Sequence, residues 1–136
     1  YDAKLARTPV ELEDFLTPLT EAGVDIFDCS TRRFWEPEFE GSRLNLAGWT
    51  KKLTGKPAIS VGSVGLNREC TNVFDGGPEA ETASIEPLVE RMQAGEFDLI
   101  AVGRALLADA EWAQKIHHSR EKEIRQFTKE ALQSLS

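Results

Sequence analysis

The sequence lacks several features that would place it in a particular class of protein. Its 136 residues contain no run of about 18 apolar residues, so we expect no membrane-spanning helix. The first residues, Tyr1-Asp2-Ala3-Lys4, include neither an initiator Met nor an apolar signal segment, and we expect a fragment or a processed piece. Basic residues are the minority, 16 against 23 acidic ones, giving a formal net charge of −7. An acidic surface disfavours phosphate backbones, so nucleic acid is not an expected partner.

Cysteine is also scarce. Cys29 and Cys70 are too few, and too far apart, for a disulfide framework or a metal site, so we expect no bound metal. A reduced, cytoplasmic protein is the simplest interpretation. The composition, 40% hydrophobic and 29% charged, is typical of one globular domain, which we place over residues 1–136.

Three short apolar segments have the pattern of buried parallel strands. They cover residues 24–29, 57–62 and 97–103, are rich in Val, Ile or Phe, and are bounded by Gly or Pro. Each connection contains a helical pattern. The first helix begins with a capping box at Thr8 and ends near Gly23, and Pro18 predicts a kink or a tightened last turn.

The later helices are predicted in the same way, from apolar spacing and end signals. One contains Leu46, Trp49 and Leu53 and ends at Gly55; the next is capped by Ser84 and ends at Gly95; a third follows Asp109 over residues 110–118; a last one contains Ile124, Phe127, Ala131 and Leu135. Residues 132–136 have the pattern of a natural helix end, and we expect a true C-terminus there.

The order of elements is therefore αβαβαβα, an alternation of helix and strand that ends in the C-terminal helices. Such alternation predicts an α/β fold with a parallel sheet and helical crossovers. Three strands do not close the common barrel, which needs eight. The two long connections, residues 30–44 and 66–83, are of a length that is typical of functional or mobile loops.

Two glycine motifs follow neighbouring predicted strands. Gly62-Ser63 follows the second strand, and Gly103-Arg104 follows the third. Glycine lets a ligand approach the backbone closely, exposed amides and a helix start attract an anion, and the Arg fork matches phosphate oxygens. In eight-stranded barrels a phosphate often binds after the seventh and eighth strands. The two motifs together predict a phosphate site.

Several segments resemble the old yellow enzyme family, the FMN-dependent NAD(P)H:flavin oxidoreductases and ene-reductases. Residues 97–109, with Gly103-Arg104, are similar to its last strand and turn. Residues 22–30 resemble its sixth strand, residues 37–42 the loop that follows, and residues 57–65 its seventh strand. The resemblance covers residues 8–116 and implies a partial TIM (β/α)8 barrel, about the last three βα units plus C-terminal helices.

The resemblance also implies roles for particular residues. Amides near Gly62 and Ser63 would bind the FMN phosphate, Gly103 would lie beside it, and Arg104 would form its ion pair. NAD(P)H would reduce FMN, and reduced FMN would reduce an activated C=C bond of a small molecule. Phe34 and Trp35 either wall the substrate pocket or pin their loop to the barrel rim. The family's catalytic residues precede this chain, so no catalytic residue is expected here.

A partial barrel leaves strand edges and one sheet face open, which favours association. We therefore expect a homo-oligomer, or pairing with the missing part of the barrel. Two alternatives to an enzyme fragment stay open. In the first alternative the chain is a partial-barrel module that binds phosphate without catalysis. In the second it is an inert folding unit.

Overall fold

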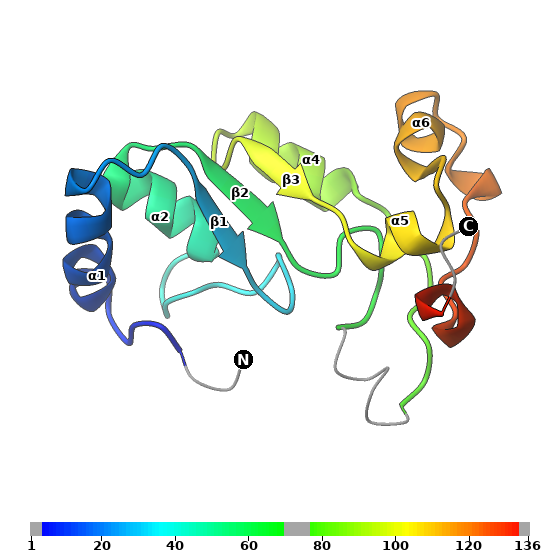
Figure 1. The fold of residues 1–136 in the computed structure, drawn as a ribbon, viewed down its shortest axis with the longest axis horizontal. Helices are drawn as coiled ribbons and strands as arrows, with labels where there is room; N and C mark the ends of the chain where they lie inside the picture. Colours follow the sequence, from blue (N-terminus) through cyan, green and yellow to red (C-terminus); the bar gives the residue numbers. More distant parts are fainter. Residues whose placement is uncertain (1–3, 70–76, 134–136) are drawn as a thin grey trace. The chain divides into compact units, whose positions relative to one another are not determined.

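The computed structural model describes residues 4–69 and 77–133. These residues form two compact units, coloured along the sequence in Figure 1. The first unit comprises Tyr1–Gly62 and Glu86–Ala101, and the second comprises Ser63–Ile85 and Val102–Ser136. The chain thus passes from the first unit to the second twice, after Gly62 and after Ala101. Each of these passages lies at one of the two glycine motifs.

The first unit contains the sheet. Its strands are β1 (Phe27–Ser30), β2 (Ala58–Val61) and β3 (Leu99–Ala101), in the order β1-β2-β3 (Figure 1). Both pairings are parallel. The three predicted strands and their parallel arrangement in an α/β fold are therefore confirmed, with shorter bounds. β1 begins later than predicted because the N–H of Val24 still bonds the carbonyl of Leu19, at 3.2 Å, and so belongs to the helix end.

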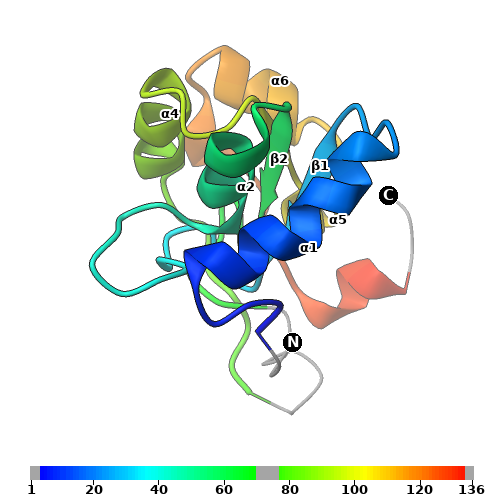
Figure 2. The ribbon, with the colours of Figure 1, turned by 90° about the vertical axis from the view of Figure 1, so that its left-hand side faces the viewer.

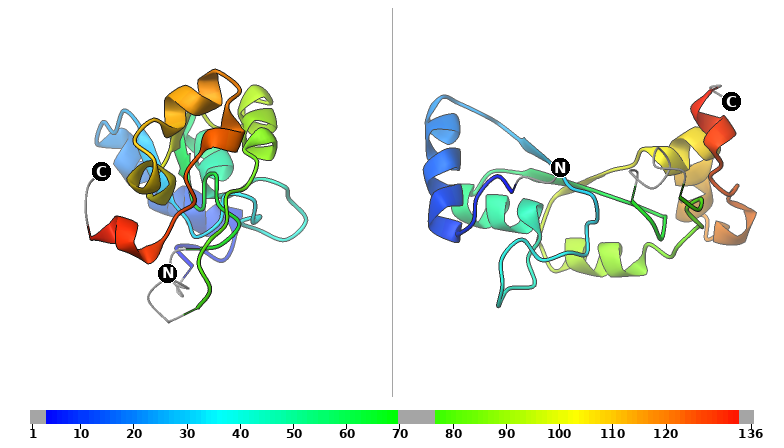
Figure 3. Two further views of the ribbon diagram at one scale, coloured as in Figure 1. Left: turned by 90° about the vertical axis from the view of Figure 1, so that its right-hand side faces the viewer. Right: turned by 90° about the horizontal axis from the view of Figure 1, so that it is seen from below.

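The two faces of the sheet differ in what covers them. Alternate residues point to opposite faces, so the aligned residues Cys29, Ser60 and Ile100 share one face. Cys29 and Ser60 are buried, and α2 (Leu46–Thr54) and α4 (Glu86–Gln93) lie on one side of the strands in Figure 3. The aligned residues Asp28, Ile59 and Leu99 share the other face, and Leu99 is 50% exposed.

The first helix, α1 (Pro9–Glu21), begins as the sequence predicts. The Thr8 hydroxyl accepts a bond from the N–H of Glu11 at 3.2 Å, and the Glu11 carboxylate accepts one from the N–H of Arg7 at 2.8 Å. The helix continues through Pro18, and its end tightens, since the N–H of Gly23 bonds the carbonyl of Thr20 at 3.1 Å. This three-residue bond confirms the tightened last turn.

The core of the first unit lies between α1 and α2, which are in contact and cross at an angle in Figure 2. Gly55 ends α2 with a left-handed φ of 66°, as predicted. The packed side chains are apolar and come from the segment before α1, from both helices, from β1 and from the loop after β1: Ala6, Leu12, Leu16, Phe27, Phe39, Leu46, Trp49 and Leu53. Burial of this cluster fixes the loop after β1 through Phe39, whose ring meets that of Trp49 at 5.3 Å.

The second unit consists of short helices around a small core. They are α5 (Arg104–Ala108), α6 (Trp112–His117) and the 3-10 turns η1 (Glu121–Glu123) and η2 (Lys129–Leu132). The core cluster contains Leu66, Ala80, Ala108 and Phe127. The continuous last helix predicted through Ile124 and Phe127 is wrong.

Side-chain carboxylates accept hydrogen bonds from backbone N–H groups that a continuous last helix would use for its own hydrogen bonds. The Asp109 carboxylate accepts from the N–H of Arg125 at 3.0 Å, and the Glu79 carboxylate accepts from that of Lys129 at 3.0 Å. Ile124 is extended, with φ −67° and ψ 130°, and Phe127 reaches the core from irregular chain. Apolar spacing alone does not reveal this competition.

Candidate functional site

Ser63, the first residue of the second unit, adopts a conformation that is uncommon for a residue with a side chain. Its φ is +52°, in the left-handed region. Its hydroxyl donates to the carbonyl of Arg68 at 2.9 Å, across a tight turn. Left-handed residues other than glycine carry strain and cluster at functional sites. The turn after β2 is therefore a candidate site.

Gly62 directly precedes Ser63, and its contacts within the first unit require a glycine at this position. Its φ is +139°, and a Cβ there would lie 2.7 Å from the carbonyl oxygen of Thr31 and 3.0 Å from the N–H nitrogen of Arg33. The N–H of Phe34 also bonds the carbonyl of Gly62 at 3.1 Å. The loop after β1 thus packs directly on this backbone, and a side chain does not fit.

Arg104 lies at the start of α5, and its guanidinium meets the turn that contains Ser63. Its Nη2 lies 3.3 Å from the Ser63 hydroxyl and 2.6 Å from the carbonyl of Arg68, and its Nη1 lies 3.3 Å from the carbonyl of Glu69. The cation also stands 5.6 Å from the ring centre of Phe127. Two of the predicted site residues, Ser63 and Arg104, are thus in contact in the second unit.

Gly103, next to Arg104, is not explained by the packing of the described chain. Its φ is −105°, outside the left-handed region, and a Cβ added to it would meet no atom within 4 Å. The open space beside this backbone suits a ligand that approaches closely. The helix that follows, α5, has only five residues, so it adds less dipole than the sequence suggested.

The loop after β1 carries Phe34 and Trp35, the residues predicted to wall a substrate pocket. Phe34 is buried, Trp35 is 40% exposed, and their rings meet edge to face at 5.1 Å. This contact holds the Trp35 ring against the ring of Phe34. A role toward substrate stays a prediction for both.

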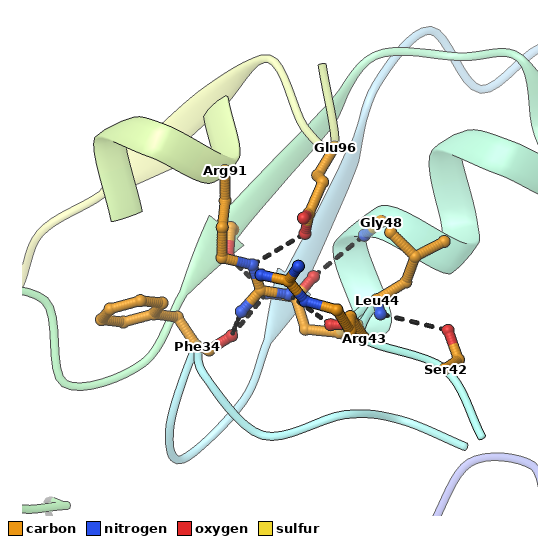
Figure 4. Close-up of polar contacts among 9 residues, drawn as sticks. Phe34, Ser42, Arg43, Leu44, Gly48, Arg91 and Glu96 are labelled. Atoms are coloured by element: carbon orange, nitrogen blue, oxygen red, sulfur yellow. Dashed lines mark hydrogen bonds and ion pairs between the residues drawn. The ribbon is translucent and has the colours of Figure 1, made fainter. Parts of the chain in front are cut away.

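Arg91, on α4, holds both ends of this loop, as Figure 4 shows. Its Nη1 donates to the carbonyl of Phe34 at 2.7 Å, and its Nη2 donates to that of Arg43 at 2.9 Å. Its Nε donates to the Glu96 carboxylate at 2.7 Å. One nearly buried guanidinium therefore fixes the base of the loop, and no local pattern in the sequence revealed it.

Asn45 is a second fixed point at the same place, and it is 1% exposed. Its side-chain oxygen caps α2 by accepting from the N–H of Gly48 at 3.0 Å. Its side-chain nitrogen donates to the carbonyl of Phe34 at 2.9 Å and to the hydroxyl of Ser60 at 3.0 Å. An Asn directly before the apolar helix pattern is the usual signal of a cap, and this signal was available in the sequence.

A buried ion pair fixes the second unit. Asp109 Oδ2 accepts from the ammonium of Lys115 at 2.7 Å, and the side chains are 3% and 8% exposed. Burial alone would raise the pKa of Asp109, but the bonds from Lys115 and from the N–H groups of Arg125 and Glu111 outweigh it and hold the pKa below its ordinary value. Asp109, which directly precedes the helix predicted over residues 110–118, also accepts from the N–H of Glu111 at 3.1 Å.

In the part of the chain that the structure describes, the remaining reactive residues do not assemble a second centre. Cys29 is buried, and burial raises the pKa of its thiol, while Cys70 lies outside the described residues. His117 and His118 are exposed and stack edge to face at 5.0 Å. Across residues 4–69 and 77–133, no group of His, Cys, Asp or Glu could hold a metal ion. Within these ranges, no helix has the length and apolar character needed to cross a membrane.

Comparison with known proteins bears on the class of chemistry. No family model matches the chain. The chain is 33% identical over 115 residues to a protein named NADH oxidase from Thermoanaerobacter brockii. The match covers 79% of this chain but only 15% of that protein. The chain is therefore similar to a short part of a protein with that name.

Proposed function

We propose that this chain is the FMN-phosphate-binding part of an FMN-dependent NAD(P)H oxidoreductase with a (β/α)8 barrel. The contact between Arg104 and Ser63 carries the proposal, because it joins the residues after β2 and β3 that were predicted to hold a phosphate. The similarity to a protein named NADH oxidase supports the same class of chemistry. So do the sequence motifs that resemble the old yellow enzyme family.

The residues present fit a phosphate group chemically. The Arg104 guanidinium is oriented by two carbonyls and a hydroxyl, so its fork is set before a ligand arrives. The backbone at Gly103 has open space beside it. Bound FMN would supply hydride transfer from NAD(P)H to an activated C=C bond. In that reaction Ser63, Gly103 and Arg104 only bind and orient, together with the backbone at Gly62.

Comparison of FMN with riboflavin tests this proposal, because riboflavin lacks the phosphate. We expect the chain to quench FMN fluorescence at concentrations where riboflavin shows at least tenfold weaker binding. Arg104→Ala removes a bond to a charged group and should weaken FMN binding by about 1.5–3 kcal/mol while leaving riboflavin unchanged. The exposed Arg120, paired with Glu123, provides a matched control, and Arg120→Ala should have no effect.

Two outcomes contradict the proposal. If FMN and riboflavin bind equally, or if Arg104→Ala leaves the FMN affinity unchanged, this site does not bind the FMN phosphate. If the 136-residue chain binds neither flavin, the same titration on the longer parent protein decides. If the longer protein is colourless and does not bind FMN, the assignment as a flavoprotein is wrong.

A phosphate-binding module without catalysis is the alternative, and the ion pair of Arg104 with a phosphate would serve it equally well. Inorganic phosphate distinguishes the two. If phosphate competes with FMN as strongly as unlabelled FMN does, the flavin ring contributes nothing to binding. The non-catalytic module is then the better description.

We further propose that the open sheet face pairs with the rest of the barrel. Ile59 and Leu99 share that face with Asp28, and β1 and β3 are the outer strands of the sheet within the described chain. An apolar strand face next to unpaired edges favours association. Light scattering should therefore show an oligomer of the isolated chain, and a stable soluble monomer would contradict this.

A further inference from the structure

Phe127 is the largest side chain in the core of the second unit, and it is 0% exposed. It shares this core with Ala108 of α5 and with Leu66, whose N–H bonds the carbonyl of Ser63 at 3.1 Å. The centre of its ring lies 5.6 Å from the guanidinium carbon of Arg104. The ring therefore lies beside both segments that form the proposed phosphate site.

The contact between Phe127 and Arg104 has the distance of a cation–π interaction. A cation within about 6 Å of the centre of an aromatic ring is attracted by the ring face, most strongly where water is excluded. Phe127 is wholly buried and Arg104 is half-buried, so little water reaches this contact. The attraction needs no acceptor atom, so it adds to the bonds that the guanidinium makes with Ser63, Arg68 and Glu69.

Irregular backbone brings Phe127 to this position. Two residues before it, the N–H of Arg125 donates to the Asp109 carboxylate at 3.0 Å. Two residues after it, the N–H of Lys129 donates to the Glu79 carboxylate at 3.0 Å. Residues 124–128, between the two 3-10 turns, are neither helix nor strand. The ring is thus placed by two carboxylates that hold the chain on either side of it.

The Arg104 guanidinium has to keep one orientation to bind a phosphate well. Its fork matches two phosphate oxygens only in a particular plane, and any motion that binding must stop costs free energy. The Ser63 hydroxyl and two backbone carbonyls direct its N–H groups. The Phe127 ring adds a contact with the central carbon, which limits movement of the whole group. The ring therefore acts on a phosphate only through Arg104.

We propose that Phe127 is a positioning residue of the phosphate site, and that its ring holds the Arg104 guanidinium in the orientation that a phosphate accepts. This role rests on the proposed function, because it concerns the same site. It makes residues 124–128, where a helix was predicted, a support of that site. A residue that serves only the core would affect FMN and riboflavin alike. A positioning residue affects only the flavin that carries a phosphate.

Phe127→Leu tests this role, because leucine keeps an apolar side chain in the core and removes the aromatic face. FMN and riboflavin are titrated into the 136-residue chain and into the variant, after circular dichroism has shown that both are folded. We expect Phe127→Leu to weaken FMN binding about threefold to tenfold, the scale of a partly desolvated cation–π contact, and to leave riboflavin unchanged. An unchanged ratio of the two affinities would overturn the proposal.

Phe97→Leu is the matched control. Phe97 is 1% exposed and belongs to the first unit, so this variant loses a buried ring of the same size in the other unit. We expect it to leave the ratio of FMN to riboflavin affinity unchanged. If Phe97→Leu lowers this ratio as much as Phe127→Leu does, the effect comes from core packing in general, and the positioning role is wrong.

A measurement on the unaltered chain decides the question if Phe127→Leu does not fold. Protons above an aromatic ring resonate upfield because of the ring current. The side-chain Hδ and Hε protons of Arg104 should therefore lie upfield of their ordinary positions, and should stay there when inorganic phosphate binds. Ordinary positions in the free chain, or a return to them when phosphate binds, would mean that the ring does not hold the guanidinium, and would overturn the proposal.

Arg104→Ala separates a failure of this inference from a failure of the proposed function. If Arg104→Ala weakens FMN binding and Phe127→Leu does not, Arg104 binds the phosphate without help from the ring, and only the positioning role is wrong. If neither variant weakens FMN binding, the proposed function is wrong, and the positioning role is wrong with it. If the chain alone binds neither flavin, the same variants of the longer parent protein are titrated, and the ratio of affinities decides there.

Discussion

The two units of this chain fix irregular backbone by different means. In the first unit, Asn45 and Arg91 donate to carbonyl oxygens of the loop after β1, with the Asn45 amide neutral and wholly buried. In the second unit, the carboxylate of Asp109 accepts backbone N–H groups and is neutralised by Lys115. The first solution extends a regular helix cap, whereas the second replaces a helix. This difference explains why sequence patterns predicted the first unit better than the second.

The largest expected effect is in the second unit. Asp109→Asn leaves the buried Lys115 ammonium with only the exposed Glu111 carboxylate, 3.7 Å away, as counter-charge, and breaking a buried pair costs about 3–5 kcal/mol. Hydrogen exchange should show the loss in amides of the second unit. Asp98→Asn breaks the more exposed pair with Lys51 in the first unit and should cost about 1 kcal/mol or less. Equal losses would contradict the comparison.

Sequence patterns predicted the first unit well because its elements follow regular periods. The three parallel strands, the capping box at Thr8 and the glycine end of α2 were all predicted. The second unit was predicted poorly after α6. There, acceptors such as Asp109 and Glu79 bind N–H groups that are 16 and 50 residues away, and no local window contains such pairs.

The candidate site was predictable to a similar extent. Gly103-Arg104 and Gly62-Ser63 were found from their positions after strands, and Ser63 and Arg104 do meet. Arg91 was missed, because its partners Phe34 and Arg43 lie 57 and 48 residues away. Asn45 was missed, although the sequence did contain a local signal for it. An asparagine directly before a helix pattern is the usual cap, and Asn45 caps α2.

The second prediction concerns Asn45 in the first unit. Asn45→Ala removes a helix cap, leaves the Ser60 hydroxyl without its donor and leaves the Phe34 carbonyl with the bond from Arg91 alone, so we expect a loss of about 2–4 kcal/mol in urea denaturation. Asn67→Ala, at an exposed asparagine of the second unit whose side chain makes two hydrogen bonds with Glu81, should cost less, about 1 kcal/mol.

The third prediction compares the two glycines beside the proposed phosphate site. Gly62→Ala forces a Cβ to within 2.7 Å of the Thr31 carbonyl at a positive φ, and should cost about 1–3 kcal/mol. Gly103→Ala meets nothing within 4 Å and should change stability by less than about 0.5 kcal/mol. Thermal denaturation measures both. A Gly103→Ala variant that is stable but weakened in FMN binding would show that this glycine serves the ligand.

The smallest expected effect is a dependence of stability on pH, with one carboxylate in each unit. The pKa of Asp98 is lowered by its bond from Lys51 and by that from the N–H of Ala58, and the pKa of Asp109 is lowered as described above. Groups with lowered folded-state pKa values stabilise fully above the unfolded-state value of about 3.9. That stabilisation is lost as the pH falls through the lower folded-state pKa.

The free energy of unfolding should therefore decrease as the pH falls below about 4, by at most about 1.4 kcal/mol per pH unit for each carboxylate. Asp109→Asn should reduce the dependence in amides of the second unit, and Asp98→Asn in those of the first. The Asp109 contribution should be the larger one, since its side chain is 3% exposed against 37% for Asp98. If Asp98→Asn removes more of the pH dependence than Asp109→Asn, the exposed pair matters more than the buried one, and the contrast between the units is wrong.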